Sequence, residues 1–267
     1  MLSIFDTGPI DRSEDDVQSL YNRFRFGNFN YDPQRYELYD FLFKEFAPQI
    51  SNTDRVYDIG CGRGFITRKL ADEHNISKKN IFSIDLSIDN IEQLKKLGFR
   101  AKVGSNLSLD VESDSVDKTI SNGVIHHTPD PDKCIDELVR ITKNDGLIYL
   151  AVYSNTFPFY RLVWYLGTPF RYIYWNINKA FIETFVFSLV NIFFIQPLGL
   201  IFYRKFISKD GAKVNFMDQL ITPYAYSFSR KNILKKLISR NCEIVKNKYF
   251  KFCLMDLFII KVKKNNL

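Results

Sequence analysis

Short apolar runs alternate with amphipathic segments through the middle of the chain. Runs at residues 56–58, 80–87, 100–104, 116–124 and 146–153 predict β-strands. Between them, residues 65–74 predict a helix, and so does the segment that opens at Asp130-Pro131. Strands that alternate with helices predict a parallel sheet with helices on both of its faces. The fold class is therefore α/β.

The last part of the chain returns to the same pattern. Ser229 is placed to cap a helix whose apolar residues lie on one face, and two strands follow at residues 243–249 and 254–262. A turn at residues 144–146 is expected to end the helix that begins at Pro131 and to open the fifth strand at Gly146. Residues 36–46 have apolar spacing that fits a helix leading into the sheet.

The first strand ends in an acid and turns at once through closely spaced glycines. The run Asp58-Ile59-Gly60-Cys61-Gly62-Arg63-Gly64 has the spacing D-x-G-x-G-x-G, which differs from the G-x-G-x-x-G of dinucleotide enzymes. Glycines at such a turn let a ligand lie against the main chain. The second strand then ends at Asp85, where a carboxylate can hydrogen-bond both ribose hydroxyls of a nucleoside.

This order of motifs resembles the core of class I S-adenosylmethionine-dependent methyltransferases over residues 54–153. The stretch at residues 121–130 resembles the fourth-strand motif of the small-molecule branch that includes the quinone methyltransferases. The resemblance implies a Rossmann-like seven-stranded sheet of order 3-2-1-4-5-7-6 with the last strand antiparallel. Two positions depart from the family pattern: Ser105 stands where an acid usually contacts the adenine amino group, and Lys143-Asn144-Asp145-Gly146 replaces Lys-Pro-Gly-Gly.

The resemblance implies S-adenosyl-L-methionine as the cofactor. Asp58 is expected to orient the methionine amino group, Asp85 to bind the ribose and Leu86 to pack on the adenine. The cofactor-binding residues that we predict are Asp58, Gly60, Cys61, Gly62, Gly64, Asp85, Leu86, Ser105, Asn106, Asn122 and Val124.

Two neighbouring histidines follow the fourth strand, where the transferred methyl group should point. An acceptor that must lose a proton requires a base that works near neutral pH. His127 is our first candidate for this base and His126 the second. The alternative is structural, with one ring capping the next helix and the other packing beneath the insertion. Asp218, Tyr224 and Tyr226 resemble residues of acceptor-side loops in related enzymes, or serve ordinary loop packing.

An aromatic, apolar insertion separates the fifth strand from the last helix. Residues 184–203 contain no charged side chain and are long enough for a membrane span. A single crossing would place two parts of one sheet on opposite sides of a bilayer, so topology argues against it. Two interpretations stay open: a helical lid that packs on the core and walls the acceptor site, or a lid that lies on a membrane and admits a lipid acceptor. Basic residues flank the apolar run, as an anionic surface would favour: Arg161, Arg171, Lys179, Arg204, Lys205 and Lys209.

Length and composition agree with one large domain that carries an insertion. The 267 residues divide into an N-terminal cap (1–53), a cofactor-binding core (54–153), the hydrophobic insertion (154–227) and the C-terminal part of the core (228–267). The formal net charge is +7, without a compact basic run. The cysteines Cys61, Cys134, Cys242 and Cys253 are scattered, so we expect reduced thiols, no metal site and a cytoplasmic protein.

The sequence therefore predicts methyl transfer from S-adenosylmethionine to a small-molecule or lipid-linked acceptor. The protein would be cytoplasmic, and the membrane interpretation would place it at the inner face of the membrane. RNA methylation is an alternative suggested by the basic charge, but no appended RNA-binding motif accompanies it and no nucleic-acid partner is expected. A second alternative is a non-catalytic protein of the same fold that binds a membrane or a partner through its insertion. The sequence gives no oligomeric state.

Overall fold

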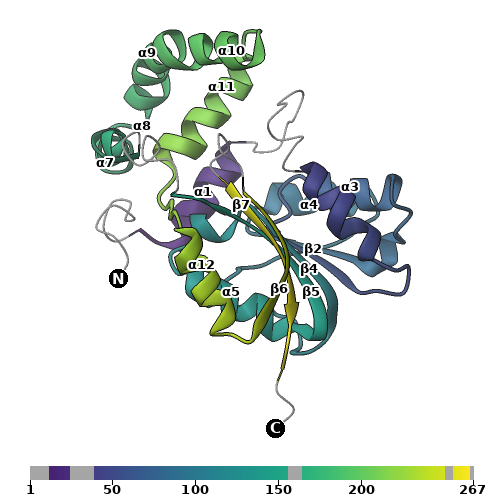
Figure 1. The fold of residues 1–267 in the computed structure, drawn as a ribbon. Coiled ribbons are helices and arrows are strands. Elements are labelled where there is room, and N and C mark those ends of the chain that lie inside the picture. The colour runs from purple at the N-terminus through teal and green to yellow at the C-terminus, as the bar shows by residue number, and fades with distance from the viewer. Residues whose placement is uncertain (1–11, 25–38, 156–163, 250–254, 265–267) are drawn as a thin grey trace.

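A seven-stranded sheet forms the centre of the molecule (Figure 1). The computed structural model describes residues 12–24, 39–155, 164–249 and 255–264. The strands are β1 (Val56–Ile59), β2 (Ile81–Asp85), β3 (Arg100–Val103), β4 (Val116–Asn122), β5 (Thr142–Tyr153), β6 (Cys242–Tyr249) and β7 (Met255–Val262). Their order is β3-β2-β1-β4-β5-β7-β6, and β7 runs antiparallel to both of its neighbours. The predicted sheet order and its antiparallel last strand are confirmed.

Helices cover both faces of this sheet. On one face, α5 (Pro131–Ile141) and α12 (Arg230–Ile238) bury their apolar residues. The other face is covered by α3 (Phe65–Asp72) and by the short helical turns η1 (Leu42–Phe46) and η2 (Ala47–Gln49). Helix α4 (Ile88–Lys96) packs against β2 and β3, and the turn η3 (Lys78–Asn80) leads into β2. Strand β5 serves both layers, because Ile148 faces one cluster and Tyr149 the other.

The helix starts follow their capping residues. The side chain of Asp130 accepts the backbone N–H of Lys133 at 3.0 Å, and that of Ser229 accepts the N–H of Asn232 at 3.1 Å. Both caps were predicted from the sequence and are confirmed.

The predicted start of the fifth strand differs from the structure. Strand β5 begins at Thr142, immediately after α5, and the expected turn is an irregularity inside the strand where Asp145 adopts φ +60°. Pairing of Val116 at the start of β4 with Thr142 extends β5 toward its N-terminus, beyond the turn residues. The helix expected over residues 36–46 is described from Tyr39 onward, and its last part is the π-helical turn η1; residues 36–38 lie outside the described residues.

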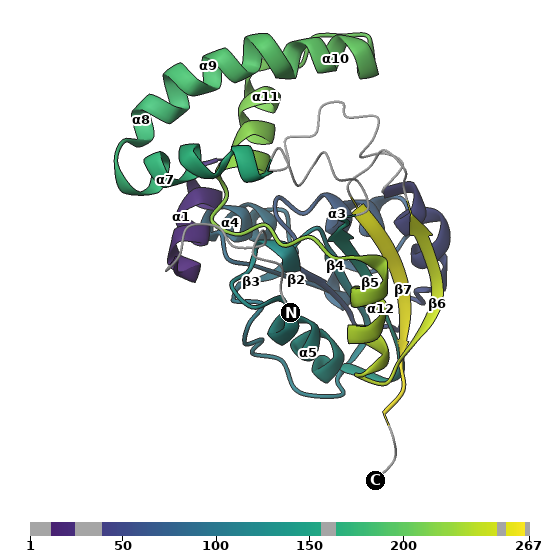
Figure 2. The ribbon, with the colours of Figure 1, turned by 60° about the vertical axis from the view of Figure 1, so that its left-hand side comes forward.

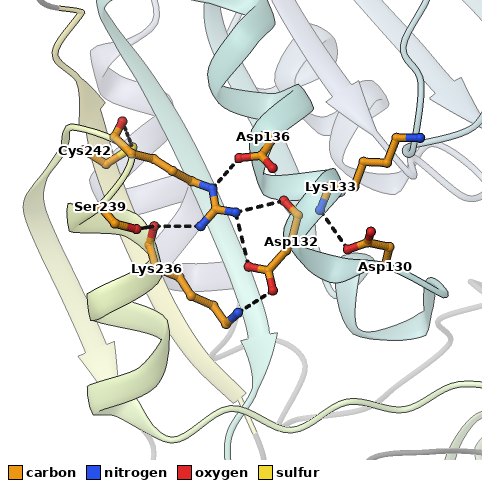
Figure 3. Close-up of polar contacts among 8 residues, drawn as sticks. Asp130, Asp132, Lys133, Asp136, Lys236, Ser239 and Cys242 are labelled. Carbon is orange, nitrogen blue, oxygen red and sulfur yellow. Dashed lines mark hydrogen bonds and ion pairs between the residues drawn. The ribbon is translucent and has the colours of Figure 1, made fainter. Parts of the chain in front are cut away.

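An ion-pair network ties α5 to the end of α12, on either side of the insertion in sequence (Figure 3). The guanidinium of Arg240 donates to Asp136 at 2.5 Å and to Asp132 at 3.2 Å. Lys236 donates to the other oxygen of Asp132 at 2.5 Å. These contacts join residues more than a hundred positions apart, so the C-terminal strands close on the same core that the first five strands build.

The insertion folds as helices that stand at one end of the sheet (Figure 2). Helix α7 (Thr168–Asn176) is followed by one continuous helix, Lys179–Ile201, which we call the apolar helix. It comprises α8 (Lys179–Phe181), η5 (Ile182–Val186), α9 (Phe187–Val190), η6 (Asn191–Ile195) and the start of α10 (Gln196–Tyr203). The chain returns to the core through α11 (Lys209–Phe216) and the π-helical turn η7 (Met217–Ile221).

The insertion has a small core of its own, which includes the N-terminal helix α1 (Glu14–Arg23). Leu20 and Phe24 of α1 pack with Trp175, Phe187 and Phe216 of the insertion. The guanidinium of Arg23 forms an ion pair with the carboxylate of Glu183, near the start of the apolar helix, at 2.9 Å. The apolar helix therefore rests on α1, α11 and η7, and Figures 1 and 2 show that it does not lie on the sheet.

Candidate functional site

A cavity of about 220 Å³ opens at the carboxyl ends of β1, β2 and β4. Strands β1 and β4 are neighbours although the chain visits β2 and β3 between them, so this is the switch point at which open α/β sheets bind ligands. The lining comes from Val17, Tyr21, Tyr39, Asp58, Gly60, Cys61, Gly62, Arg63, Phe65, Ile66, Asp85, Leu86, Asn90, Asn106, Asn122, Gly123, Val124, His126, His127, Thr128, Tyr153, Asp218 and Met255.

The glycine turn forms the floor of this cavity. Gly60, Gly62 and Gly64 all have positive φ, at +72°, +52° and +72°. A Cβ on Gly60 would come within 2.5 Å of the Val124 side chain, and one on Gly64 within 2.2 Å of Leu94. A Cβ on Gly62 would meet nothing within 4 Å. The outer glycines are therefore needed for packing, whereas Gly62 keeps open the space that a ligand would fill.

Asp85 lies at the end of β2 and connects the glycine turn to α4. One carboxylate oxygen accepts the Gly62 N–H at 2.8 Å, and the other accepts the Ser87 N–H at 2.9 Å and the Asn90 side chain at 3.2 Å. Burial raises the pKa of Asp85 above its ordinary value, and these hydrogen bonds act in the opposite direction. The carboxylate is thus fixed in orientation at the cavity wall, where a ribose could reach it.

Asp58 is almost completely buried at the end of β1. Its Oδ2 accepts the hydroxyl of Thr67 at 2.7 Å, and Thr67 in turn contacts the Ser83 hydroxyl at 2.8 Å. Burial raises the pKa of Asp58 to about 7, against the lowering effect of Thr67 and with a further rise caused by Asp85. A cation in the cavity would favour the carboxylate form, as the ammonium group of a bound amino acid would.

The end of the cavity near β3 holds Asn106 and not Ser105. Asn106 is buried, and among the described residues none donates to its Oδ1. Ser105 is absent from the lining; its hydroxyl donates to Glu14 of α1 at 2.5 Å and accepts the Leu107 N–H at 3.0 Å. Asn106 therefore offers an acceptor to a ligand in the cavity, and Ser105 connects this edge to α1.

Helix α1 forms part of the cavity wall. Val17 and Tyr21 line the cavity, and the side chain of Gln18 donates to the Leu86 carbonyl at 2.7 Å. Helix α1 of the N-terminal segment thus lies against the cavity.

The opposite end of the cavity follows β4. Among the described residues, the buried Oδ1 of Asn122 also lacks a hydrogen-bond donor. The 3₁₀ turn η4 (Ile125–His127) comes next and presents both histidines to the cavity. The rings contact each other with centroids 4.4 Å apart, and His126 stacks on Tyr153 at 3.7 Å.

The histidines differ in what their ring nitrogens contact. Nδ1 of His126 faces the backbone N–H of Tyr153 at 3.2 Å, so it must accept and the neutral ring carries its proton on Nε2. Burial lowers the pKa of His126 well below its ordinary value, and His127 adds to this. Nδ1 of His127 donates to the Tyr224 carbonyl at 2.8 Å, so Nε2 is the ring nitrogen that can accept a proton. This geometry favours His127 over His126 as a proton acceptor.

The structure thus brings most of the predicted site residues into one cavity. Of the predicted cofactor-binding residues and histidines, only Gly64 and Ser105 are not in its lining; of the acceptor-side candidates, Tyr224 and Tyr226 are not in it. Sequence reasoning missed Asn90, Tyr153 and the α1 residues, and it gave Asp218 only as a weak acceptor-loop candidate. Tyr153 ends a strand that looks like ordinary core, and nothing local marks Val17 or Tyr21. The signal at Asn90 was available, since it stands one turn into the helix that follows Asp85.

The cavity residues fit S-adenosylmethionine. Gly62 leaves room beside the main chain, and Asp58 and Asp85 supply carboxylates for an ammonium group and a ribose. Buried amide oxygens at Asn106 and Asn122 lack donors among the described residues. When bound, this cofactor supplies an activated methyl group, and the protein's own task is to position donor and acceptor.

Comparisons with known proteins agree with this fit. The model of the methyltransferase domain family matches residues 57–150. Over 125 residues the chain is 28% identical to a malonyl-(acyl-carrier protein) O-methyltransferase of Legionella pneumophila. The aligned region covers 45% of this chain and 43% of that protein. The matched region therefore spans less than half the length of this curated relative.

Solved structures share the fold. A methyltransferase from Methanosarcina mazei that depends on S-adenosylmethionine is 17% identical, with a TM-score of 0.51 and coverage of 89% of this chain and 100% of that chain. A methyltransferase in complex with the Haloferax volcanii Trm112 methyltransferase activator is 14% identical, with a TM-score of 0.56 and coverage of 95% and 98%. The comparisons match the domain as a whole, and the quinone-type branch stays a prediction. The glycine turn, its two acids, the sheet order and the family match identify this chain as carrying a class I S-adenosylmethionine-dependent methyltransferase domain.

Proposed function

We propose that this protein transfers a methyl group from S-adenosylmethionine to a lipid-linked acceptor at a membrane surface. The observation that carries the proposal is the exposure of the apolar helix. Its most hydrophobic 18-residue window has a mean hydropathy of 1.9, yet only 17% of that window is buried. A soluble lid would be expected to bury such a face against the core, because large exposed apolar patches are uncommon on monomers.

The two faces of the apolar helix have different surroundings. Ile182, Val186 and Phe187 are buried in the insertion's own core. The outward side chains are large and apolar, and each is more than two-fifths exposed: Phe181, Phe185, Leu189, Ile192, Phe193, Phe194, Leu198, Leu200 and Ile201. Phe206, just beyond α10, is 71% exposed. Large exposed apolar side chains thus occur along the whole length of the helix.

The connections of the insertion to the core determine the orientation that the apolar helix would take at a membrane. Both ends of the insertion return to one sheet, through β5 and α12, so the apolar helix would lie in the plane of the interface. Lys179 stands at its start, and Arg204 and Lys209 are exposed just beyond its end. Basic residues at the ends of an apolar face suit the headgroups of anionic lipids. Of the other basic residues named for this flank, Arg171 is buried and Arg161 lies outside the described residues.

The catalytic end of the cavity supports an acceptor that loses a proton. The Legionella relative is named as an O-methyltransferase of a malonyl-(acyl-carrier protein). A malonyl group carries a free carboxylate, which is already a nucleophile and has no proton to lose. Here the carboxylate of Asp218 lines the cavity beside His127, where it would repel an anionic acceptor. A neutral hydroxyl or an amine suits this site better.

The buried thiols of Cys134 and Cys242 are free, which supports placing the protein on the cytoplasmic side; Cys253 lies outside the described residues.

Vesicle binding tests the membrane surface. The protein should sediment with vesicles containing phosphatidylglycerol, and salt should weaken the binding. Phe193→Ser combined with Phe194→Ser should abolish sedimentation without changing affinity for S-adenosylhomocysteine. The matched control is Ile238→Ser, which replaces a similarly exposed side chain on α12. Equal sedimentation of the double variant and the control would contradict the assignment of the apolar helix.

Methyl transfer is tested with tritiated S-adenosylmethionine and a total extract of cells that lack the protein. Label should enter the chloroform-soluble fraction and require the folded protein. Label that enters only the aqueous small-molecule fraction would support a soluble acceptor and a closed lid. Label in RNA would support the nucleic-acid alternative, and no label in any fraction would support a non-catalytic protein.

A further inference from the structure

The insertion contributes a carboxylate to the cavity as well as an outer surface. Asp218 lies in η7, is 9% exposed and lines the cavity. Its Oδ1 lies 3.6 Å from Nε2 of His127. The two residues are far apart in sequence, so only the return of the insertion to the core brings them together.

Asp218 is held by two donors on its other oxygen. Oδ2 accepts the hydroxyl of Tyr153 at 3.1 Å and the side-chain amide of Gln219 at 2.8 Å. The same amide donates to the Tyr153 hydroxyl at 2.7 Å. With Oδ2 engaged in this way, Oδ1 is the oxygen that faces the imidazole.

His127 is oriented from its other side. Nδ1 contacts the Tyr224 carbonyl at 2.8 Å, and a carbonyl can only accept, so Nδ1 carries a proton in every form of the ring. Nε2 is therefore the nitrogen that gains and loses a proton, and it is the one beside Asp218. An acceptor atom placed within hydrogen-bond reach of both Nε2 and Oδ1 is compatible with their 3.6 Å separation.

We propose that Asp218 is the positioning residue that makes His127 a base, by stabilising the imidazolium which forms when the acceptor loses its proton. This inference rests on the proposed function, because it assumes an acceptor of the hydroxyl or amine class. The acceptor's proton moves to Nε2 of His127, and the freed electron pair forms the bond to the methyl carbon. The electrons of the broken carbon–sulfur bond stay on the sulfur, and His127 later returns its proton to water. Charge is balanced because the positive charge lost at sulfur appears on the imidazole.

The other titratable groups around His127 do not replace this carboxylate. His126, Tyr153 and Tyr21 contact the His127 ring, with centroids 4.4, 5.3 and 6.3 Å away. Burial lowers the pKa of His126 well below its ordinary value, which favours the neutral ring. Asp218 is thus the acidic side chain that faces the ring among the described residues that line the cavity near it.

Nitrogen-15 NMR of the imidazole rings tests the pair without any acceptor. The wild-type spectrum should show His126 protonated on Nε2 and His127 protonated on Nδ1. Asp218→Asn keeps an acceptor for Tyr153 but removes the charge beside Nε2 of His127, so the nitrogen-15 resonance of that nitrogen should change. Asp218→Glu should restore most of the wild-type resonance. Asp210→Asn, an exposed site on the same insertion, is the matched control and should change nothing.

The tritium-transfer assay then tests the consequence for the reaction. Asp218→Asn should lower the single-turnover rate by about ten- to a hundredfold while the dissociation constant for S-adenosylhomocysteine stays unchanged. Unchanged His127 resonances in Asp218→Asn, or a wild-type rate in that variant, would overturn the inference. If the wild-type protein transfers no label, the proposed function fails, and the NMR comparison still decides whether Asp218 controls His127.

Discussion

The backbone N–H of Gly62 donates a hydrogen bond to Oδ2 of Asp85, at 2.8 Å and across 23 positions of sequence. The two motifs that identified the domain are therefore in direct contact. The carboxylate is oriented by the same glycine that leaves space for the ligand. A change at either residue should affect cofactor binding before it affects the rest of the fold.

Asp85→Ala should weaken binding of S-adenosylmethionine and S-adenosylhomocysteine to a similar extent. Loss of a charge-assisted hydrogen bond costs about 1.5–3 kcal/mol, or roughly ten- to a hundredfold in affinity. Titration calorimetry measures both constants. Asp89→Ala, which removes an exposed carboxylate from the first turn of α4, is the control and should bind normally. Equal affinities of the two variants would remove Asp85 from the site.

Cofactor affinity should depend on pH through Asp58. Because the pKa of Asp58 is raised to about 7, the empty site holds a proton below that pH. An ammonium group binds the ionised form, so affinity should rise by up to roughly tenfold per pH unit below 7 and level off above it. Calorimetry from pH 5.5 to 8.5 gives this profile. Asp58→Asn should bind weakly and without this dependence; a flat wild-type profile would show that Asp58 does not meet the cation.

The raised pKa of Asp58 also predicts that the stability of the cofactor-free protein falls as pH rises, whereas its affinity for the cofactor increases. A raised carboxyl pKa means that the folded state binds the proton more tightly, so the free energy of unfolding should fall as pH rises from roughly 4 to 7. Each unit corresponds to about 1.4 kcal/mol, so Asp58→Asn should stabilise the cofactor-free protein by up to about 4 kcal/mol at pH 8. Urea unfolding at pH 5 and pH 8 measures this difference. A variant less stable than wild type at both values would contradict it.

Asn106→Ala should weaken S-adenosylhomocysteine binding by about tenfold, the effect of one neutral hydrogen bond. An analogue whose adenine amino group is replaced by oxygen identifies the contact. If Asn106 accepts from that amino group, the variant and wild type should bind the analogue almost equally. Ser105→Ala is the matched control, since Ser105 bonds to Glu14 outside the cavity lining. A larger loss in the Ser105 variant would move the adenine edge to that residue.

Leu20→Ala should destabilise the protein by about 2–5 kcal/mol, the usual cost of a cavity at a buried leucine. Leu20 is 1% exposed and packs among insertion residues, so the loss should loosen α1 from the insertion. Urea unfolding monitored by tryptophan fluorescence is a suitable measurement because Trp175 belongs to the same cluster. Leu166→Ala, at a 58% exposed site, should cost little. Similar losses in both variants would show that α1 is not anchored there.

The sequence alone predicted most of the strands, the helix starts and the motif residues that line the cavity, whereas the order of the sheet came from the resemblance to the methyltransferase family. Strand and helix periodicities are local, and helix caps such as Asp130 and Ser229 act within one turn. The glycine turn and Asp85 were recognisable because a main chain that closely approaches a ligand requires particular residues at fixed spacing. The predicted start of β5 was wrong because pairing with β4 overrode the turn signal at residues 144–146.

Only the tertiary structure decided where the insertion packs and which of its faces is exposed. The same apolar composition would serve a buried lid or an exposed surface, and the difference depends on which elements pack beneath the helix. Likewise, no local pattern connects Asp218 to His127, since their 3.6 Å separation results from the path of the chain through α11 and η7 back to the core. Long-range contacts of this kind depend on how whole elements pack, and neither periodicity nor spacing encodes them.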